Sequence, residues 1–246
     1  VPPLVPSPRQ FGYRTRVKLV VRRVGSKPVI GLYIPETHKV TDASACAVHP
    51  RQVNSVVQAL LEAIEELNIP PYDEEKDTGL LRYLDLRYSL WSHQVLLTLV
   101  TRNMHFPQAR DLIRELERRF PFLSGIVQNI HDKPGNVIWG ERFYPLFGRD
   151  SLVEKFGPLK LNIPVSAFAQ ANPPVARKIY ELVLEWALLK GDEIALGRCQ
   201  PGVGAFPNQV ALKLGQRRED VKDQPTARGR GIELLLQAAE TDPPCC

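Results

Sequence analysis

A basic segment near the start of the chain, after a proline-rich lead-in, has residue types that could contact a nucleic acid. Arg14, Arg16 and Lys18 alternate with apolar residues, and Tyr13 precedes them. Lysine and arginine bind phosphate oxygens, and exposed aromatic rings stack on unpaired bases. The pattern therefore predicts an RNA-facing sheet surface, and a solvated sheet face would explain it equally well. The same candidate surface also includes Arg22, Arg23 and Tyr33.

Two other stretches offer groups that could hold a small molecule. The glycines of Gly202-Val203-Gly204 have no Cβ, so a turn there would let a ligand approach the backbone. The stretch SAFAQAN contains Gln170, whose side-chain amide could contact a ligand or tie a loop to neighbouring backbone. From the residues alone both alternatives stay open, because a single GxG is also a common turn.

The chain has four cysteines, Cys46, Cys199, Cys245 and Cys246, which form no CxxC pair. A disulfide-stapled secreted fold is therefore not expected. From the residues alone Cys46 is interpreted as a small buried thiol. The five histidines show no metal-ligand spacing, and the sequence has neither a Walker-type phosphate loop nor a serine nucleophile elbow.

Composition sets the outer bounds on the class of protein. The 246 residues are 43% hydrophobic and carry a net charge of +5, which permits a nucleic-acid partner without requiring one. No apolar run approaches the roughly 18 residues that span a bilayer, so we expect a cytoplasmic protein with no membrane partner. We also expect the protein to be monomeric. Because Val1 is the first residue and Met104 the only methionine, this N-terminus is not expected to be an initiation site.

Hydrophobic periodicity predicts the elements that position these residues. Period-two alternation predicts strands, and apolar residues at i, i+3, i+4 and i+7 predict helices. The predicted strands cover residues 14–24, 29–34, 39–43, 80–90, 94–101, 123–130, 137–139, 143–147 and 159–164. The predicted helices cover residues 50–67, 107–119 and 173–190. Trp91-Ser92-His93 is the expected turn of a hairpin.

The last predicted helix has a recognisable beginning. Asn172 is the expected helix cap and Pro173 the first helical residue. We expect Phe168 to be a core residue. The helix is expected to bury one apolar face, made of Val175, Ile179, Leu182, Val183 and Trp186.

Short strands next to hairpin turns predict an α+β domain with a largely antiparallel sheet over residues 1–157. A second unit is expected over residues 158–246, beginning near Gly157-Pro158. Beyond Leu214 the sequence becomes polar and loses periodicity, and residues 232–239 could form no more than two helical turns.

Several segments, taken in order, resemble the RNA (uracil-5) methyltransferases. Tyr13-Arg14-Thr15-Arg16 resembles the signature that opens the family's central domain, and the segment from Ile30 to Asp42 resembles the hairpin that follows it. Cys46-Ala47-Val48 resembles the segment with the last cysteine of the family's iron–sulfur cluster. SAFAQAN stands in the place of the family's phenylalanine, glutamine, any residue, asparagine motif. The match covers most of residues 7–192.

The resemblance implies a central α+β domain followed by an incomplete Rossmann-like methyltransferase domain that is degenerate after about residue 195. It implies transfer of a methyl group from S-adenosylmethionine to C5 of uridine in RNA, through a covalent adduct between a cysteine and C6. By the resemblance, 23S ribosomal RNA is expected rather than transfer RNA. Gln170, Gly202 and Gly204 would contact the cofactor, and the basic segment would contact the RNA.

The family's [4Fe–4S] cluster needs four cysteine ligands. The resemblance places Cys46 at the position of the fourth ligand, and no cysteine precedes it in this sequence. Cys46 would therefore be an orphaned ligand position, and the ligand set of the cluster is incomplete.

The sequence departs from the family's pattern near the glycine turn. Pro201 removes a backbone donor, and Ala205 stands where a threonine or asparagine is expected. No residue can be assigned as nucleophile or base, so this chain alone is expected to be inactive, as a truncated or frameshifted part of an enzyme. The alternatives are a non-catalytic RNA-binding protein and a structural remnant.

Overall fold

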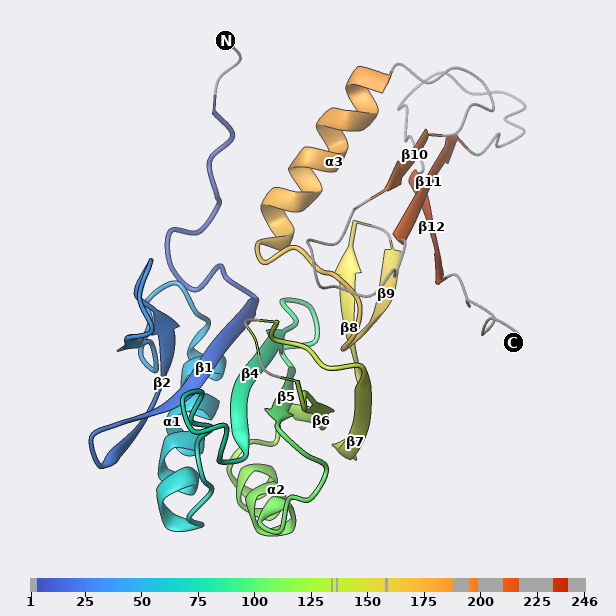
Figure 1. Cartoon of the computed structure of the whole chain (residues 1–246). Helices are drawn as coiled ribbons and strands as arrows, with labels where there is room; N and C mark the ends of the chain where they lie inside the picture. Colours follow the sequence, from blue (N-terminus) through green and yellow to red (C-terminus); the bar gives the residue numbers. More distant parts are fainter. Residues whose placement is uncertain are drawn as a thin grey trace, which may run out of the picture.

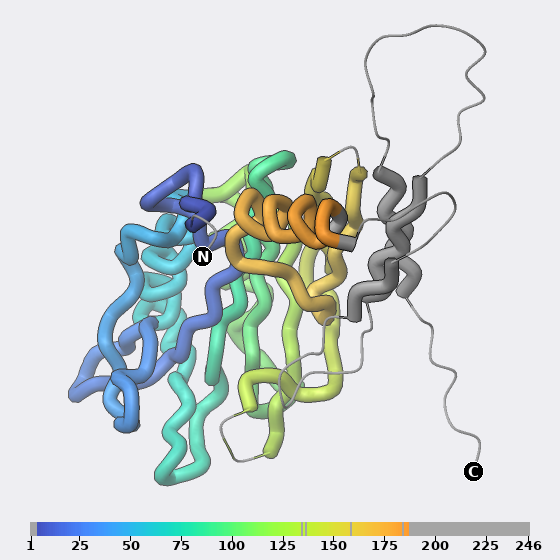
Figure 2. Tube along the Cα trace, turned by 90° about the horizontal axis from the view of Figure 1, so that it is seen from above, coloured from blue at the N-terminus to red at the C-terminus, as the bar shows by residue number. Residues whose placement is uncertain are grey.

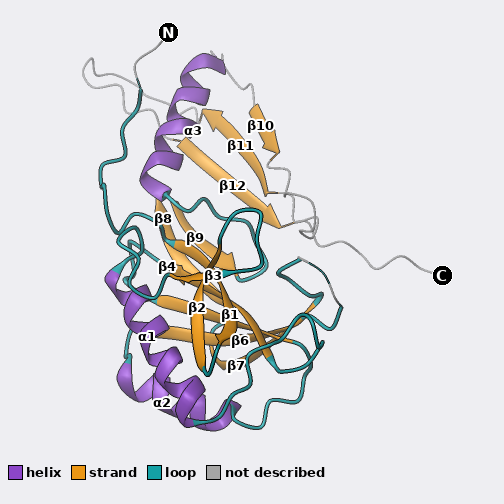
Figure 3. Cartoon of the chain, turned by 60° about the vertical axis from the view of Figure 1, so that its left-hand side comes forward, coloured by secondary structure: helices purple, strands orange, loops and turns teal. Residues whose placement is uncertain are grey.

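A single sheet dominates the computed structural model, which describes residues 4–133, 135, 137–157, 159–187, 195–198, 210–216 and 232–238. The sheet has seven strands in the order β3-β2-β1-β4-β5-β6-β7. These strands are β1 (Arg16–Val24), β2 (Lys27–Tyr33), β3 (Val40–Asp42), β4 (Leu81–Tyr88), β5 (Val95–Thr101), β6 (Leu123–Ile130) and β7 (Arg142–Gly148). Helices α1 (Arg51–Glu66) and α2 (Ala109–Arg119) cover one face of it (Figures 1 and 3).

The sheet is mixed and mostly antiparallel. Every neighbouring pair of strands is antiparallel except β5 and β6, which are parallel. Parallel neighbours need a crossover connection, and α2 supplies it here. The predicted combination of short hairpins and two helices is therefore present in this part of the chain.

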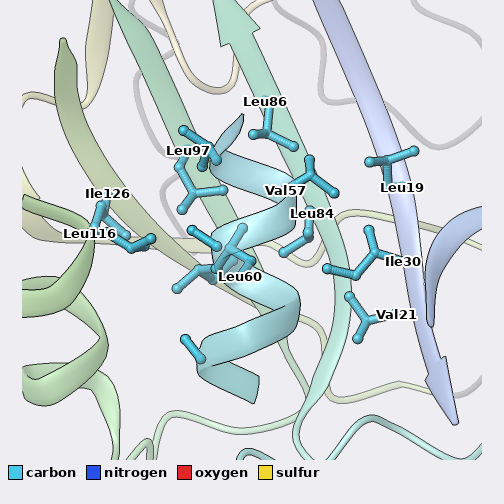
Figure 4. Close-up of a cluster of buried hydrophobic side chains, with 14 of the residues drawn as sticks. Leu19, Val21, Ile30, Val57, Leu60, Leu84, Leu86, Leu97, Leu116 and Ile126 are labelled. Atoms are coloured by element: carbon cyan, nitrogen blue, oxygen red, sulfur yellow. The ribbon is translucent and has the colours of Figure 1, made fainter. Parts of the chain in front are cut away.

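The core lies between the sheet and the two helices. On α1, Val53, Val56, Val57, Leu60 and Ile64 are buried, which is the face that the apolar spacing predicted. Figure 4 shows this helix against side chains of the sheet. The labelled partners on the strands are Leu19, Val21, Ile30, Leu84, Leu86, Leu97 and Ile126. Each fully buried side chain of this size contributes roughly 1.5–3 kcal/mol of transfer free energy.

The opposite face of the sheet is covered by a loop, where a strand over residues 137–139 was predicted. That prediction is wrong, because side-chain hydrogen bonds take the place of a strand ladder. The side-chain amide of Asn129 donates to the carbonyls of Gly140 (3.0 Å) and Arg142 (3.1 Å), and its oxygen accepts the Gly140 N–H at 2.8 Å. These bonds hold the loop on the sheet, and Trp139, which precedes Gly140, packs against the apolar cluster that contains Leu96.

After the sheet, the chain forms a separate hairpin of β8 (Ser151–Phe156) and β9 (Leu159–Pro164). Strand β8 was not predicted from the sequence. The expected domain boundary at residue 157 falls in the turn of this hairpin, where Gly157 has φ +61°. A positive φ of this size favours glycine, since it has no Cβ.

Helix α3 (Pro173–Ala187) follows, and Asn172 caps it as predicted, its side-chain oxygen accepting the Val175 N–H at 3.4 Å. The expectation of a buried apolar face is wrong for Ile179, Val183 and Trp186, which are exposed. Helix α3 has no sheet against this part of its surface in the described residues.

A three-stranded sheet of β10 (Ala195–Arg198), β11 (Val210–Gln216) and β12 (Ile232–Ala238) lies beyond α3. Residues 232–238 form a strand, whereas the sequence pattern predicted no regular structure there beyond at most two helical turns. Both pairings in this sheet are antiparallel. A Rossmann-like unit is built from parallel strands, and this continuation is therefore not confirmed. No helix in the described part of the chain is long and apolar enough to cross a membrane.

A buried arginine next to His131 gives the fold a measurable pH dependence. Arg82 donates to the carbonyls of His131 and Lys133, each at 2.8 Å, and its guanidinium lies 4.3 Å from the ring centroid of Tyr72. Burial and the positive charge of Arg82 lower the pKa of His131 to about 4, from 6.5 for a free histidine. Protonation of His131 therefore opposes the folded state.

We expect His131 to make the protein less stable as the pH falls from about 6.5 to about 4. In that window the unfolded chain binds a proton that the folded chain does not, so stability falls by up to about 1.4 kcal/mol per pH unit. Urea unfolding of His131→Gln across this range should show a shallower slope. His105→Gln removes an exposed histidine and is the matched control, and its slope should differ from that of the unaltered protein by less than that of His131→Gln.

Candidate functional site

The basic residues of β1 lie on the sheet face away from the helices, as their alternation predicted. Val17 and Leu19 point into the core, while Arg16 and Lys18 point to the opposite face. The Lys18 Nζ lies 5.4 Å from the ring centroid of Trp139, and burial lowers the pKa of Lys18, assisted by Arg16. Since Arg16 and Lys18 are both partly buried, this is not a freely solvated sheet face.

The two ends of the basic segment differ in accessibility. Arg14 is exposed and Tyr13 is half-buried. Arg22 is buried, and its guanidinium pairs with the carboxylate of Glu74, which also accepts the hydroxyl of Tyr33 at 2.8 Å. Arg22 and Tyr33 are therefore occupied within the fold, which removes them from the candidate RNA surface.

The SAFAQAN segment is fastened to the basic face of the sheet by Arg87 on β4. The Arg87 guanidinium donates to the carbonyls of Pro164 (2.8 Å) and Ala167 (3.0 Å) and also to that of Val165. At the other end of the segment, the Thr15 N–H donates to the Ala171 carbonyl at 2.7 Å. These hydrogen bonds join Arg87 to Ala167, which is 80 positions away in the chain, and Thr15 to Ala171, which is 156 positions away.

Arg87 is itself held by a buried carboxylate. Asp85 is 0% exposed and Arg87 is 4% exposed, and the Arg87 Nε lies 3.2 Å from Asp85 Oδ2. The other oxygen of Asp85 faces Arg16 Nε at 3.6 Å. Burial lowers the pKa of Arg87, and the charge of Asp85 opposes this shift. The Asp85 carboxylate thus accepts a hydrogen bond from Arg87 and lies near the positive charge of Arg16.

Gln170 lies beside the start of β1, next to the anchored Ala171 and the helix cap Asn172. Its side chain is exposed, so its amide is accessible to a ligand. Phe168 is also exposed, at 44%, and its ring centroid lies 6.0 Å from the Arg16 guanidinium. The expectation that Phe168 belongs to the core is therefore wrong, because its ring covers an arginine on the outer face of the sheet.

A groove of about 600 Å³ adjoins this segment, between the N-terminal residues and the start of α3. Tyr13, Arg9 and Asn172 are among the residues that line it. The Asn172 side chain donates to Ser7 Oγ at 3.1 Å, which ties the two walls together. Figure 2 shows the N-terminal segment beside the start of α3. Gly202 and Gly204 lie outside the described residues.

Cys46 lies in the turn before α1 and is half-buried. The Asn54 side chain donates to the Cys46 carbonyl at 3.0 Å, and Asn54 Oδ1 lies 3.2 Å from His49 Nδ1. Among the described residues no group of three or more histidine, cysteine or acidic side chains could hold a metal ion. The donor set around Cys46 therefore does not fit an iron–sulfur cluster, which needs four thiolates.

Asp85 and Arg87 were not among the predicted site residues. Both stand at alternate positions of the strand LRYLDLRY, among residues that are all buried. Charged side chains are seldom fully buried unless they are paired, so their spacing in an apolar strand was an available signal. Trp139 was not predicted as a site residue for another reason. Its partners include residues of β1 and β5, which are distant in the chain and come together only in the fold.

The mixed sheet with few helices resembles the fold of a transfer RNA methyltransferase. The solved structure is that of Pyrococcus abyssi tRNA (uracil-54, C5)-methyltransferase in complex with S-adenosyl-L-homocysteine. It matches with a TM-score of 0.63 and 28% identity, over 77% of this chain and 44% of that one.

Sequence comparison points to the same class of enzyme. An uncharacterized RNA methyltransferase of Geobacter sulfurreducens is 36% identical over 238 residues, which are 97% of this chain and 45% of the relative. One of Clostridium acetobutylicum is 31% identical over 94% of this chain and 47% of the relative. No family model matches the chain.

The chain is thus a homologue of RNA methyltransferases, and the resemblance to the uracil-5 type is confirmed. It spans about half the length of the curated relatives that it matches. The match of 238 residues with the Geobacter protein necessarily extends beyond residue 195.

Proposed function

We propose that this chain supplies the RNA-facing sheet and the start of the cofactor-binding domain of an S-adenosylmethionine-dependent RNA uracil-5 methyltransferase. The observation that carries the proposal is the fastening of the Gln170 segment to the basic sheet face by Arg87 and Thr15. This contact would bring a cofactor-binding group and RNA-binding groups to one edge of the sheet.

In the complete protein, the reaction would transfer a methyl group from S-adenosylmethionine to C5 of uridine through a covalent cysteine adduct at C6. Bound S-adenosylmethionine would supply the methyl group. The exposed amide of Gln170 would hydrogen-bond the cofactor, and Asn172 would fix the backbone beside it as the helix cap. Gly202 and Gly204 would provide a close backbone approach, as their sequence suggests.

RNA would bind across the basic end of the sheet. Arg14 is exposed and can reach a phosphate, while Arg16 and Lys18 maintain positive potential behind it. Tyr13 lines the adjoining groove, where it could meet a base. We propose 23S ribosomal RNA as the substrate. The tRNA specificity in the name of the Pyrococcus protein makes transfer RNA the alternative to compare with it.

Three further features belong to this proposal. The chain would divide near residue 157 into a central domain and a methyltransferase unit, act in the cytoplasm and be monomeric. Without an assigned nucleophile or base, the chain alone would bind without turning over. Cys46 would serve as a structural thiol here, since no group of metal ligands surrounds it in the part of the chain that the structure describes.

Replacing Gln170 with alanine is expected to weaken binding of S-adenosylhomocysteine about tenfold, the loss of one hydrogen bond to the ligand. Isothermal titration on the full chain measures this affinity. Gln58→Ala, an exposed glutamine on α1, is the matched control and should bind normally. Equal affinities for all three proteins would contradict the role of Gln170.

RNA binding is tested separately on the same proteins. Fluorescence anisotropy with a uridine-containing 23S hairpin and with a transfer RNA, at several salt concentrations, would show which RNA binds more tightly. Arg14→Ala should lower the affinity and reduce the slope of log affinity against log salt by about 1, the value for one phosphate contact. Arg110→Ala, at an exposed arginine on α2, should change neither the affinity nor this slope. RNA binding without S-adenosylhomocysteine binding would favour the alternative of a non-catalytic RNA-binding protein.

A further inference from the structure

The turn between β4 and β5 presents a tryptophan to solvent. Trp91 is 44% exposed, although large aromatic rings are mostly buried in folded proteins. Trp91 was predicted to lie in a hairpin turn, and the sequence pattern indicated no role for it. An exposed aromatic side chain on a turn becomes informative when the surrounding structure holds it in place.

The backbone of this turn is fixed by a buried carboxylate from another element. Glu154 on β8 is buried, and its carboxylate accepts the N–H groups of Leu90 (2.9 Å) and Trp91 (3.2 Å). Ser89 Oγ accepts the N–H groups of Trp91 (3.2 Å) and Ser92 (2.9 Å). Burying a carboxylate is costly unless it is hydrogen-bonded, and here the bonds serve to hold the backbone beside Trp91.

One lysine lies over the tryptophan ring, and a second lysine is its partner across the hairpin. The Lys160 Nζ lies 5.1 Å from the ring centroid of Trp91. Lys160 is paired across the β8–β9 hairpin with Lys155, and both are exposed. Like charges directly opposite on a hairpin repel each other. In the described part of the chain neither lysine makes an ion pair with an acidic side chain, so an anionic ligand would relieve this repulsion.

The tryptophan lies at the same end of the sheet as the RNA-facing residues. Arg16 pairs with Arg87 across β1 and β4, and the Tyr88 N–H donates to the Thr15 carbonyl at 2.8 Å. Trp91 follows Tyr88 by three residues. The turn therefore continues the edge that carries Arg14 and Gln170.

The combination of a fixed aromatic ring and unpaired lysines has a defined chemical preference. A base of single-stranded RNA can stack on an aromatic ring, while lysines bind its flanking phosphates. Duplex RNA keeps its bases stacked inside the helix, so it offers no base to the ring.

We propose that Trp91, Lys155 and Lys160 form a binding site for an unpaired base and its flanking phosphates in RNA. This inference rests on the proposed function, since the ligand is a single-stranded part of the RNA substrate. The ring stacks on the base, and the Lys160 ammonium moves from the ring to an adjacent phosphate. The site extends the RNA path beyond the basic segment of β1.

The test is anisotropy titration of the full chain with a fluorescein-labelled single-stranded octauridylate and with a duplex of equal length. Trp91→Leu is expected to weaken single-strand binding about tenfold or more and to leave duplex binding unchanged. Trp91→Phe, which keeps an aromatic ring, should retain most of the affinity. Trp186→Leu, at an exposed tryptophan on α3, is the matched control and should bind normally.

The contribution of the two lysines is measured independently, through the salt dependence of RNA affinity. The double variant Lys155→Gln/Lys160→Gln should reduce the slope of log affinity against log salt by up to about 1.4, the value for two phosphates on a single strand. Lys27→Gln, at an exposed lysine on β2, should not change this slope. Thermal unfolding of each variant checks that the fold is intact.

The possible failures are distinguishable. If RNA binding depends on Arg14 but not on Trp91, the tryptophan site is overturned and the proposed function stands. If the octauridylate and the duplex lose affinity equally in Trp91→Leu, base stacking is overturned. If the unaltered chain binds S-adenosylhomocysteine but neither RNA, both the tryptophan site and the RNA-binding part of the proposed function fail.

Discussion

Arg87→Met is expected to lower the free energy of unfolding by roughly 3–5 kcal/mol. Methionine keeps the apolar stem but removes the guanidinium that faces Asp85 and three backbone carbonyls. Asp85 is fully buried and would keep Arg16, at 3.6 Å, and Lys18, its partner across β1 and β4, as charged neighbours, without the hydrogen bond that Arg87 donates. An uncompensated buried charge makes the loss of one partner far more costly than the loss of a surface ion pair.

The same change should also weaken the cofactor site. The carbonyls of residues 164, 165 and 167 would lose their common donor, so the segment that carries Gln170 would no longer be fastened to the sheet. We expect S-adenosylhomocysteine affinity to fall in Arg87→Met even at temperatures where the protein stays folded. Titration at 10 °C, with circular dichroism to confirm the fold, separates this effect from unfolding.

Two further variants act as controls for Arg87→Met. Arg118→Met removes an exposed arginine that pairs with Glu115, and it should change stability by less than about 1 kcal/mol. Asp85→Asn/Arg87→Met removes both charges and should recover part of the loss, because the buried carboxylate is gone. A single variant as stable as the unaltered protein would contradict the anchoring role of Arg87.

The elements that could be predicted are those with a local pattern. The apolar spacing of α1 and the alternation of β1 depend on residues within one element, and both were predicted within a few residues of their observed bounds. Strand β8 was missed because its alternation is brief: Leu152 and Glu154 are its two buried residues. From the sequence alone, Glu154 would be predicted to face solvent, because the backbone N–H groups that it binds belong to a distant turn.

The candidate site shows why alternation alone cannot assign function. Arg16 and Arg22 have the same phase in β1, so the sequence placed both on one RNA-facing surface. Glu74, which is 52 positions away in the chain, pairs with Arg22, whereas Arg16 stays at the edge near the Gln170 segment. Which arginine stays next to the candidate site depends on contacts that only the folded chain creates.

Gly140→Ala is expected to cost about 3 kcal/mol or more of stability. A Cβ at this position would lie 1.5 Å from the backbone carbonyl oxygen of Ile130, which no side-chain rotation can relieve. The backbone would have to shift, and the paired hydrogen bonds between Gly140 and the Asn129 amide would be stretched. Overpacking costs about 1–3 kcal/mol, and each weakened buried hydrogen bond adds to it.

The matched control for Gly140→Ala is Gly25→Ala in the β1–β2 turn. No atom lies within 4 Å of a Cβ there, but φ is +61°, so the cost should be only the backbone strain of roughly 1–2 kcal/mol. Urea unfolding compares the two variants. Because Trp139 adjoins Gly140 and packs against Phe143 and the Lys18 ammonium, Gly140→Ala should also change the tryptophan fluorescence. Equal losses of stability in the two variants would contradict the prediction, because they would show that the close contact between Gly140 and the Ile130 carbonyl is not needed to hold the loop on the sheet.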